Sequence, residues 1–322
     1  MSTGGSIPYH LRQNKAIERN LFVDLLNRVG RYQNISESTY IGFGGPFLED
    51  FKHLHASLRI GNMISLEIDE DVFKRQLFNQ PISCIDLNHQ SSADFITNYD
   101  FNDPVVVWLD YATPEIGEQL IELQRLVEKL GPGDIFKITL NAHPQTLGGK
   151  PGPNLHEQRA EEAFRRLGDY GPAQVTEDDV KPKNYPKLLL DAILSSAKKG
   201  IRGGPGYIVQ PLASFVYSDG MQMLTFTGIV LNATDKEKFI ESTRLNHWKF
   251  SDLTGEKQSL ISVPAFSIKE RLHVESMLPE KSAATILDSL GFFIGEKDSA
   301  TQLMENFVQF YRVYPWYSRI IV

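Results

Sequence analysis

The stretch ESTYIGFGGPFLEDF runs from a short apolar segment through closely spaced glycines to a proline and a helix-like tail. Gly42, Gly44 and Gly45, with Phe43 among them, allow the backbone to turn sharply and to approach a ligand closely. Pro46 suits the first turn of a following helix, whose exposed N–H groups attract an anion. Three interpretations stay open: a dinucleotide site, an S-adenosylmethionine site, or a tight turn without a ligand.

The spacing of the glycines and of the next acid bears on this choice. The dinucleotide fingerprint G-x-G-x-x-G requires a third glycine where Phe47 stands, so a pyrophosphate fits less well. Glu67 lies 25 residues after Gly42, near the end of the second apolar run. A carboxylate there can accept hydrogen bonds from both ribose hydroxyls, which NAD and S-adenosylmethionine share. The structural alternative is an acid that caps the next helix, a role that Asp69 can also fill.

Short β-type runs alternate with helix-like segments and must position these residues. Five such runs are 39–43, 63–68, 82–87, 105–109 and 134–140. This alternation predicts βαβ units and a parallel sheet covered by helices on both faces. In such a sheet, ligands bind beyond the carboxyl ends of the strands, where the strand order reverses.

The chain after the fifth run follows a different pattern. Residues 207–217 and 221–231 flank the turn sequence SDG, which predicts an antiparallel hairpin. We expect an α/β fold: a Rossmann-like, mostly parallel sheet with this hairpin, followed by a helical C-terminal extension. Residues 1–232 would form the Rossmann-like domain, with 144–206 as an insertion that can act as a lid, and 233–322 the mainly helical extension.

Helix boundary signals accompany this division. Thr113 can cap a long amphipathic helix, Pro114 suits its first position, and Gly131 ends it. Ser267 and Glu270 form a capping-box pattern in the C-terminal extension.

Composition narrows the class of protein and its compartment. The chain of 322 residues is 41% apolar and 23% charged, as is ordinary for a globular protein. Its one cysteine, Cys84, excludes an intrachain disulfide and suits a reducing cytosol. No apolar run approaches the length of about 18 residues that spans a bilayer. We therefore expect a cytoplasmic protein without a membrane segment.

Charge gives no support for a nucleic-acid partner. A net charge of −7 leaves no electrostatic footprint for nucleic acid over the whole chain, although a local basic patch stays open. The basic stretches KPKNYPK and SSAKKGIRGG are typical of a solvated face. The C-terminal FYRVYPWYSR, which includes Trp316 and Tyr317, indicates core packing or a contact between copies in a homo-oligomer.

Four motifs together resemble a known superfamily. YIGFGG, SLEID, CIDLN and VVVWLDY, in this order and spacing, are similar to the successive motifs of Rossmann-like class I S-adenosylmethionine-dependent methyltransferases. The hairpin after five βα units also matches that fold. The resemblance covers roughly residues 15–232, and the chain looks most like bacterial O-methyltransferases.

The resemblance implies S-adenosylmethionine as the cofactor. It would set Gly42 and Gly44 beside the methionine part of this cofactor and make Glu67 the ribose contact. Asp86, with Leu87, would lie near the adenine.

At the end of the fourth run, the resemblance implies that Asp110 and Tyr111 face the methyl group. Asp110 can accept a proton or position an amine, and His143 is the best general base by its ordinary pKa. A loop histidine bonded to the backbone is the alternative for His143. Metal-dependent catechol-type enzymes are similar in layout, but Leu140 beside Asn141 breaks their ligand set, so we expect no metal.

The sequence thus predicts methyl transfer from S-adenosylmethionine, with an oxygen of a small molecule as the acceptor. A nicotinamide-dependent oxidoreductase is the first alternative, although Phe47 and the hairpin oppose it. The second is a non-catalytic binding module that keeps the methyltransferase fold. Two departures from the family pattern favour the module: Tyr40 replaces an acid two residues before the first glycine, and Pro46 replaces the third glycine.

Overall fold

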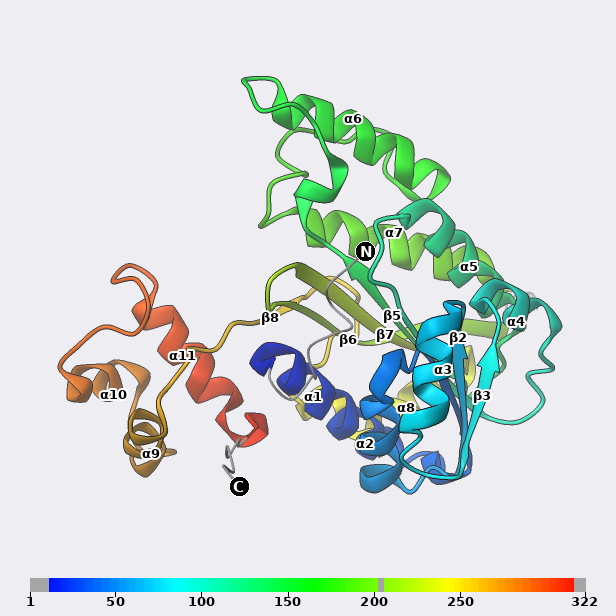
Figure 1. Cartoon of the computed structure of the whole chain (residues 1–322), viewed down its shortest axis with the longest axis horizontal. Coiled ribbons are helices and arrows are strands. Elements are labelled where there is room, and N and C mark those ends of the chain that lie inside the picture. Colours follow the sequence, from blue (N-terminus) through cyan, green and yellow to red (C-terminus); the bar gives the residue numbers. More distant parts are fainter. Residues whose placement is uncertain (1–11, 202–205, 316–322) are drawn as a thin grey trace.

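A single twisted sheet forms the centre of the computed structural model, which describes residues 12–201 and 206–315 (Figure 1). The sheet has eight strands in the order β3-β2-β1-β4-β5-β7-β6-β8. β7 is antiparallel to both β5 and β6, and the other neighbouring pairs are parallel. The strands are β1 (Thr39–Gly42), β2 (Asn62–Glu67), β3 (Ile85–His89), β4 (Val105–Asp110), β5 (Ile135–Asn141), β6 (Tyr207–Ser218), β7 (Gln222–Asn232) and β8 (Ser259–Ile261).

This sheet confirms the predicted fold class. The five expected runs correspond to β1–β5, and the expected hairpin is formed by β6 and β7. Gly220, in the turn between them, has a φ of 116°, which favours glycine. The three-residue strand β8, which pairs with β6 at the edge of the sheet, was not predicted.

Helices cover both faces of the sheet. They are α1 (Gln13–Val29), α2 (Glu49–Leu58), α3 (Glu70–Asn79), α4 (Ser92–Asn98), α5 (Ile116–Lys129), α6 (Leu155–Leu167), α7 (Tyr185–Gly200), α8 (Lys236–Thr243), α9 (Ile268–Ser276), α10 (Ala283–Leu290) and α11 (Ala300–Phe310). Alternate strand residues face opposite sides, so Val106 and Trp108 join the core with α1, α2 and α8, whereas Val107 and Leu109 join the core with α4, α5 and α7.

One expected helix start is wrong. α5 begins at Ile116, with Glu115 at the N-cap position and no capping bond from its side chain. Thr113 lies two residues before this position, and its carbonyl and hydroxyl oxygens accept from the side chain of Gln119, at 3.0 and 3.1 Å.

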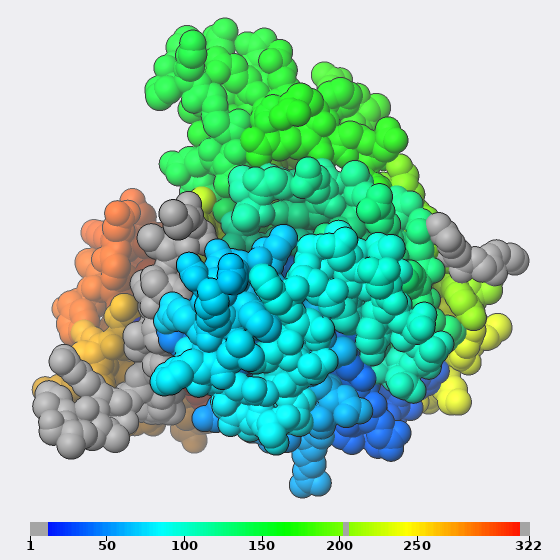
Figure 2. All heavy atoms as spheres, turned by 45° about the vertical axis from the view of Figure 1, so that its right-hand side comes forward, coloured from blue at the N-terminus to red at the C-terminus, as the bar shows by residue number. Residues whose placement is uncertain are grey.

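The expected insertion contains two different structures. α7 packs against α5 and β7 and belongs to the cover of the sheet. α6 stands out from the body of the molecule, in green at the top of Figure 2. It is fastened at its end, because Arg166 donates to the carbonyl of Pro114 at 3.2 Å. Residues 202–205 of this range lie outside the described residues, as do Trp316 and Tyr317.

The C-terminal helices α9, α10 and α11 lie to one side of the sheet, beyond β8 and α1 (Figure 1). The capping box predicted for Ser267 and Glu270 is confirmed, with both reciprocal hydrogen bonds present at the start of α9. Phe307 and Phe310 of α11 are fully buried in the same core as α1. No helix in the described part of the chain is both long and apolar enough to cross a bilayer.

Candidate functional site

The strand order reverses between β1 and β4, which marks the crevice where open α/β sheets bind ligands. Gly42, Glu67 and Asp110 are the last residues of β1, β2 and β4, so three of the expected site residues end strands at the same edge. The strands β3 and β5 end at His89 and Asn141.

The glycine turn after β1 is tightly packed by the chain itself. A Cβ atom at Gly42 would lie 2.7 Å from the hydroxyl of Tyr40. A Cβ at Gly44 would collide with Leu48 and lie 2.6 Å from Oγ of Ser65. Gly45 has a φ of 50°, which side chains rarely adopt. Packing within the chain therefore requires glycine here, whether or not a ligand approaches the turn.

Glu67 combines burial with spare capacity to accept hydrogen bonds. Its Oε1 accepts from the backbone N–H of Asp69 at 2.9 Å, and burial raises its pKa. The helix cap is Asp69, which accepts from the N–H groups of Asp71 and Val72 at 2.9 and 3.0 Å. Because a carboxylate offers about four acceptor positions, Glu67 can still accept bonds from a ligand's hydroxyls.

Asp86 and Leu87 lie farther from this edge than Glu67. Asp86 pairs with Ile64, whereas Glu67 pairs with His89, three positions nearer the carboxyl end. At about 3.3 Å per residue, this places Asp86 about 10 Å below the edge. Leu87 packs into the core on the α1 side.

His89 is the β3 residue at the level of Glu67. Its ring stacks on Phe73 with centroids 5.0 Å apart, and its Nε2 lies 3.2 Å from the carbonyl oxygen of Ile68. His89 was not predicted from the sequence because β3 extends two residues beyond the apolar run that marked it.

The loops after β1 and β4 meet through two aromatic rings. Phe43 and Tyr111 form an edge-to-face pair with centroids 5.5 Å apart. The hydroxyl of Tyr111 donates to Glu122 at 2.5 Å, and burial together with Glu122 raises its pKa well above the ordinary value. Tyr111 therefore keeps its proton and borders the crevice with the face and edge of its ring.

Asp110 is paired with two cations of α1. Its Oδ2 lies 3.0 Å from a guanidinium nitrogen of Arg19 and 3.7 Å from Nζ of Lys15. Burial alone would raise the pKa of Asp110, but Lys15 and Arg19 together lower it to about 2. A carboxylate with so low a pKa is ionised at neutral pH and is a weak base.

Arg19 also belongs to a larger buried network that was not predicted from the sequence. Its guanidinium reaches Glu18 at 2.9 Å and Asp50 at 3.4 Å. Glu18 in turn lies 2.6 Å from Nζ of Lys137, whose side chain is 1% exposed. Burial lowers the pKa of Lys137 to about 8, and its ammonium sits 3.5 Å from the centroid of the Trp108 ring. Alternating charges thus fix α1 onto the sheet.

His143 lies in the loop after β5 and is bonded to the backbone. Its Nδ1 accepts from the N–H of Gln145 at 3.2 Å, so the neutral ring carries its hydrogen on Nε2. This is the geometry of the structural alternative given for His143 above. In this arrangement the free side of the ring donates a hydrogen bond rather than accepting a proton.

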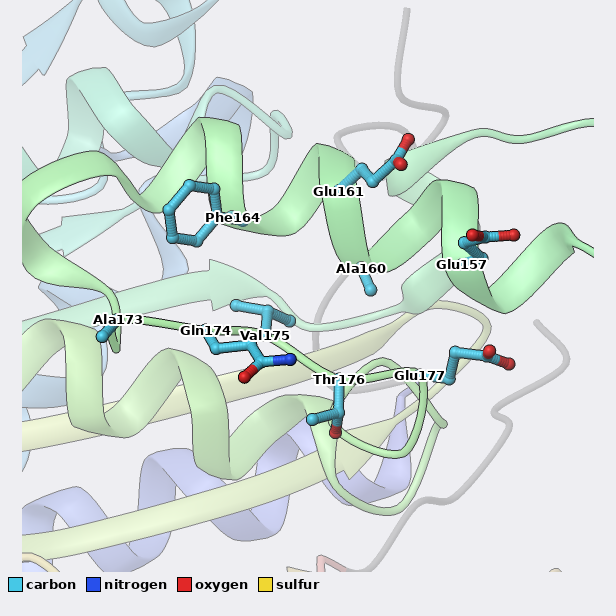
Figure 3. A pocket seen from close by; sticks show the side chains of 9 residues that line it. All are labelled: Glu157, Ala160, Glu161, Phe164, Ala173, Gln174, Val175, Thr176 and Glu177. Carbon is cyan, nitrogen blue, oxygen red and sulfur yellow. The ribbon is translucent and has the colours of Figure 1, made fainter.

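Two cavities differ in their relation to this edge of the sheet. One, of about 690 Å³, lies between α1 and α2, and Arg19, Phe47 and His53 are among its lining residues. The other, of about 500 Å³, is lined only by residues between 157 and 177 of the insertion. In Figure 3, Phe164 and the carboxylates of α6 lie across from the loop that carries Val175 and Glu177. No strand end contributes to this second cavity.

A metal centre is not indicated by the side chains present. Among residues 12–201 and 206–315, no group of three or more His, Cys, Asp or Glu side chains is placed to hold a metal ion. Asp110 is paired with Lys15 and Arg19, and Asn141 accepts from the N–H of His143 at 3.1 Å.

Comparison with known proteins gives one match over nearly the whole chain. Residues 7–322 match the model of a protein family described as "Putative O-methyltransferase". No curated protein matches the sequence.

Similar solved structures include Trm1 from Pyrococcus horikoshii with S-adenosyl-L-methionine, at 12% identity and a TM-score of 0.46, covering 70% of this chain and 57% of that one. The chain thus spans little more than half of the Trm1 structure. The N-methyltransferase NodS from Bradyrhizobium japonicum WM9 has 9% identity and a TM-score of 0.39, with 67% of this chain and 97% of that one covered.

Proposed function

The chain belongs to the family described as "Putative O-methyltransferase", and from this membership we propose that it methylates an oxygen atom of a small-molecule acceptor. The methyl group would come from S-adenosylmethionine, the co-substrate that the family implies. The observation that carries the proposal is the position of Gly42, Glu67 and Asp110 at one edge of the sheet, around the reversal between β1 and β4.

We assign the ends of the cofactor to particular strand ends. Glu67 would hold the ribose hydroxyls, because it is partly buried and keeps acceptor capacity beyond its bond to Asp69. The loop from Gly42 to Gly45, with Phe43 and Tyr111, would border the methionine part. Asn88 and His89 lie nearer the carboxyl edge than Asp86 and Leu87, which makes them the better candidates for the adenine side.

The chemistry leaves two tasks to the protein. S-adenosylmethionine carries an already activated methyl group, so the protein must align the acceptor and remove its proton. Asp110 is suited to electrostatic positioning, because Lys15 and Arg19 keep it ionised. The hydroxyl of Tyr111 donates to Glu122, and Nδ1 of His143 accepts from the N–H of Gln145, so neither atom is free to take a proton. We infer that another residue is the base.

Two alternative functions are an oxidoreductase and a non-catalytic binding module. Family membership favours a methyltransferase over a nicotinamide-dependent oxidoreductase. A non-catalytic module with the same fold would bind the cofactor without turning over any acceptor. Calorimetric titration with S-adenosylhomocysteine, and with NAD⁺ as the control, separates these classes. We expect binding of S-adenosylhomocysteine alone; binding of NAD⁺ alone, or of neither, would overturn the proposal.

A paired substitution tests the ribose contact. Glu67→Gln keeps an acceptor for the N–H of Asp69 but removes the charge, and should weaken S-adenosylhomocysteine binding by about 1.5–3 kcal/mol, or roughly 10- to 100-fold. Glu70→Gln is the matched control, because the side chain of Glu70 is 68% exposed and pairs with Lys74 of the same helix. Equal affinity of the two folded variants would contradict the assignment of Glu67.

A further inference from the structure

The cavity of about 690 Å³ between α1 and α2 is called the α1–α2 groove from here on. Two segments connect it to the carboxyl edge of the sheet: the segment after the glycine turn, and α1. Phe47 and Asp50 line it and follow the glycine turn directly. Arg19 lines it from α1 and donates to Asp110 at 3.0 Å, so one side chain separates the groove from the end of β4. A ligand in the groove would therefore lie next to both segments assigned to the cofactor.

One face of α2 forms a wall of this groove. Its residues repeat at helical spacing: Glu49, Lys52, His53 and Ala56. The adjacent face of the same helix, with Phe51 and Leu54, is buried in the core. A helix with one face in the core and a second face lining a concave site is a rigid support for a functional side chain.

His53 is the titratable residue on this wall with a buried polar atom that has no hydrogen-bond partner among the described residues. This atom is Nε2, for which residues 12–201 and 206–315 supply no hydrogen bond; it is closed off from solvent, so an acceptor in the groove reaches it only when the side chains around it move. Leaving a buried imidazole nitrogen unpaired costs free energy, and in a native structure such an atom calls for an explanation. In unliganded enzymes, the hydrogen bonds of catalytic groups often form only when the substrate is bound.

Burial, more than the neighbouring charges, favours the neutral ring of His53. Burial lowers its pKa below the ordinary range; Asp50 on the same helix opposes this shift and Arg19 on α1 adds to it. Two other histidines are already engaged, since Nδ1 of His143 accepts from Gln145 and Nδ1 of His55 lies 2.8 Å from the carbonyl of Ile60. His53 is the histidine among the residues that line the groove.

Resting on the proposed function, we propose that the α1–α2 groove binds the methyl acceptor, an aromatic molecule with a hydroxyl group, and that His53 takes the hydroxyl proton. The walls suit an aromatic ring, because Phe47, Pro81 and Pro315 present apolar surface beside the polar groups. A phenol has a pKa of about 10, as in tyrosine, whereas an aliphatic alcohol lies near the value of water, about 16. The phenol is therefore by far the easier of the two for a neutral imidazole to deprotonate.

One proton and one methyl group move in this reaction. The O–H bond of the acceptor breaks and its proton passes to the imidazole of His53. The oxygen lone pair forms the new bond to the methyl carbon, and the bond from this carbon to sulfur breaks with its electron pair left on sulfur. The imidazolium then releases the proton to solvent, which gives a methyl ether and S-adenosylhomocysteine.

Acceptor class is tested with a panel of simple phenols up to 2-naphthol, and with decahydro-2-naphthol as the saturated control of similar shape. We expect methyl ethers from phenols and none from the saturated alcohol. Equal turnover of 2-naphthol and decahydro-2-naphthol would overturn the aromatic assignment. So would the absence of turnover of any phenol by protein that binds S-adenosylhomocysteine.

The base is tested with His53→Gln against His55→Gln, two histidine variants of the same helix. His53→Gln should lower kcat by about 100- to 10,000-fold and remove the pH limb that wild type shows below the ordinary histidine pKa of about 6.5. His55→Gln should retain both, and S-adenosylhomocysteine affinity should be the same in all three proteins. Retention of the limb in His53→Gln would refute the role of His53.

The groove is tested without catalysis. Ala56→Leu adds bulk to an exposed helix position in the wall and should weaken 2-naphthol binding, measured by its fluorescence, by roughly tenfold or more. Failure of wild type to bind S-adenosylhomocysteine would remove the proposed function itself. Binding of S-adenosylhomocysteine and methylation of 2-naphthol that are indifferent to His53 and Ala56 would remove this inference alone.

Discussion

At the scale of single residues, Asp110 shows how neighbours change what a side chain can do. Burial would raise its pKa, but Lys15 and Arg19 lower it from an ordinary 3.8 to about 2. Between these values the unfolded chain binds more protons than the folded one, so stability falls as the pH falls. The contribution is present in full above pH 4 and lost through pH 2, and is worth about 2 kcal/mol.

Urea denaturation at pH 5 and pH 2.5 tests this coupling. Between these two conditions, wild type should lose about 1–2 kcal/mol more unfolding free energy than Asp110→Asn, which cannot titrate. Asp100→Asn, at an exposed loop position, should lose as much as wild type. A loss in Asp110→Asn that equals the wild-type loss would contradict the ion pairing of Asp110.

The same residues show what the sequence can and cannot predict about the site. Glu67 and Asp110 were found because apolar runs end at them, and the end of a run is visible in the sequence. Their partners were not, since Lys15 and Asp110 are brought together only by packing of α1 on the sheet. His53 was missed for the same reason: its environment depends on Arg19 of another helix.

Glycine substitutions illustrate a further limit at this scale. The sequence alone predicts that valine in place of Gly44 would obstruct a ligand at the turn. The structure adds that any Cβ at Gly44 collides with Leu48 and crowds Ser65. Lost binding in such a variant would report damage to the turn as readily as loss of ligand contact, so Glu67 gives the cleaner test.

At the scale of elements, the start of α1 is capped from across the molecule. Asp219, in the turn between β6 and β7, accepts from the N–H of Lys15 at 2.7 Å and from the N–H and side chain of Asn14 at 3.3 and 3.0 Å. Negative charge at a helix N-terminus is favourable, and these bonds satisfy N–H groups that the helix leaves open. The turn thereby fixes the helix that carries Arg19.

Asp219→Ala should therefore lower the free energy of unfolding by about 1–2 kcal/mol, and Asp219→Asn by less, because an amide oxygen can still accept. Urea denaturation at pH 7 measures both. Asp100→Ala serves as the control and should stay within about 0.5 kcal/mol of wild type. If Asp219→Ala behaves like this control, the turn does not cap α1.

Element prediction succeeded where apolar runs alternated with helical patterns or met a turn or capping signal. β1–β5 and the hairpin follow apolar runs of clear period, and α9 follows its capping box. The strand β8 has only three residues and gains its hydrogen bonds from Phe215, Val216 and Tyr217 of β6. Nothing in so short a segment distinguishes a strand from a loop before its partner is known.

At the scale of the whole molecule, the C-terminal part completes the core that α1 begins. Phe250 stacks on Phe310 with centroids 5.2 Å apart and lies 6.4 Å from Phe215 of β6. Phe239 of α8 meets Tyr32, after α1, at 5.2 Å. These contacts join residues far apart in the sequence. The change of sequence pattern could therefore place a boundary at residue 232, but it could not show whether the two sides fold independently.

This shared core predicts that the chain unfolds as one cooperative unit. Two variants each retain one described tryptophan: Trp248→Phe with Trp316→Phe leaves Trp108 in the sheet, and Trp108→Phe with Trp316→Phe leaves Trp248 beyond residue 232. In each variant, the urea transition followed by fluorescence should coincide with that followed by far-ultraviolet circular dichroism, as a two-state transition requires.

Truncation supplies the complementary test of the same prediction. A chain of residues 1–232 would expose the buried partners of Phe239, Phe250 and Phe310 and should lose its cooperative transition. Separate midpoints for the sheet and C-terminal fluorescence, together with a folded 1–232 chain, would establish two independent domains instead. Since Asn20 of α1 donates to the carbonyl of Val313 at 2.8 Å, such independence would also mean that α1 packs on the sheet without this bond to the C-terminal part.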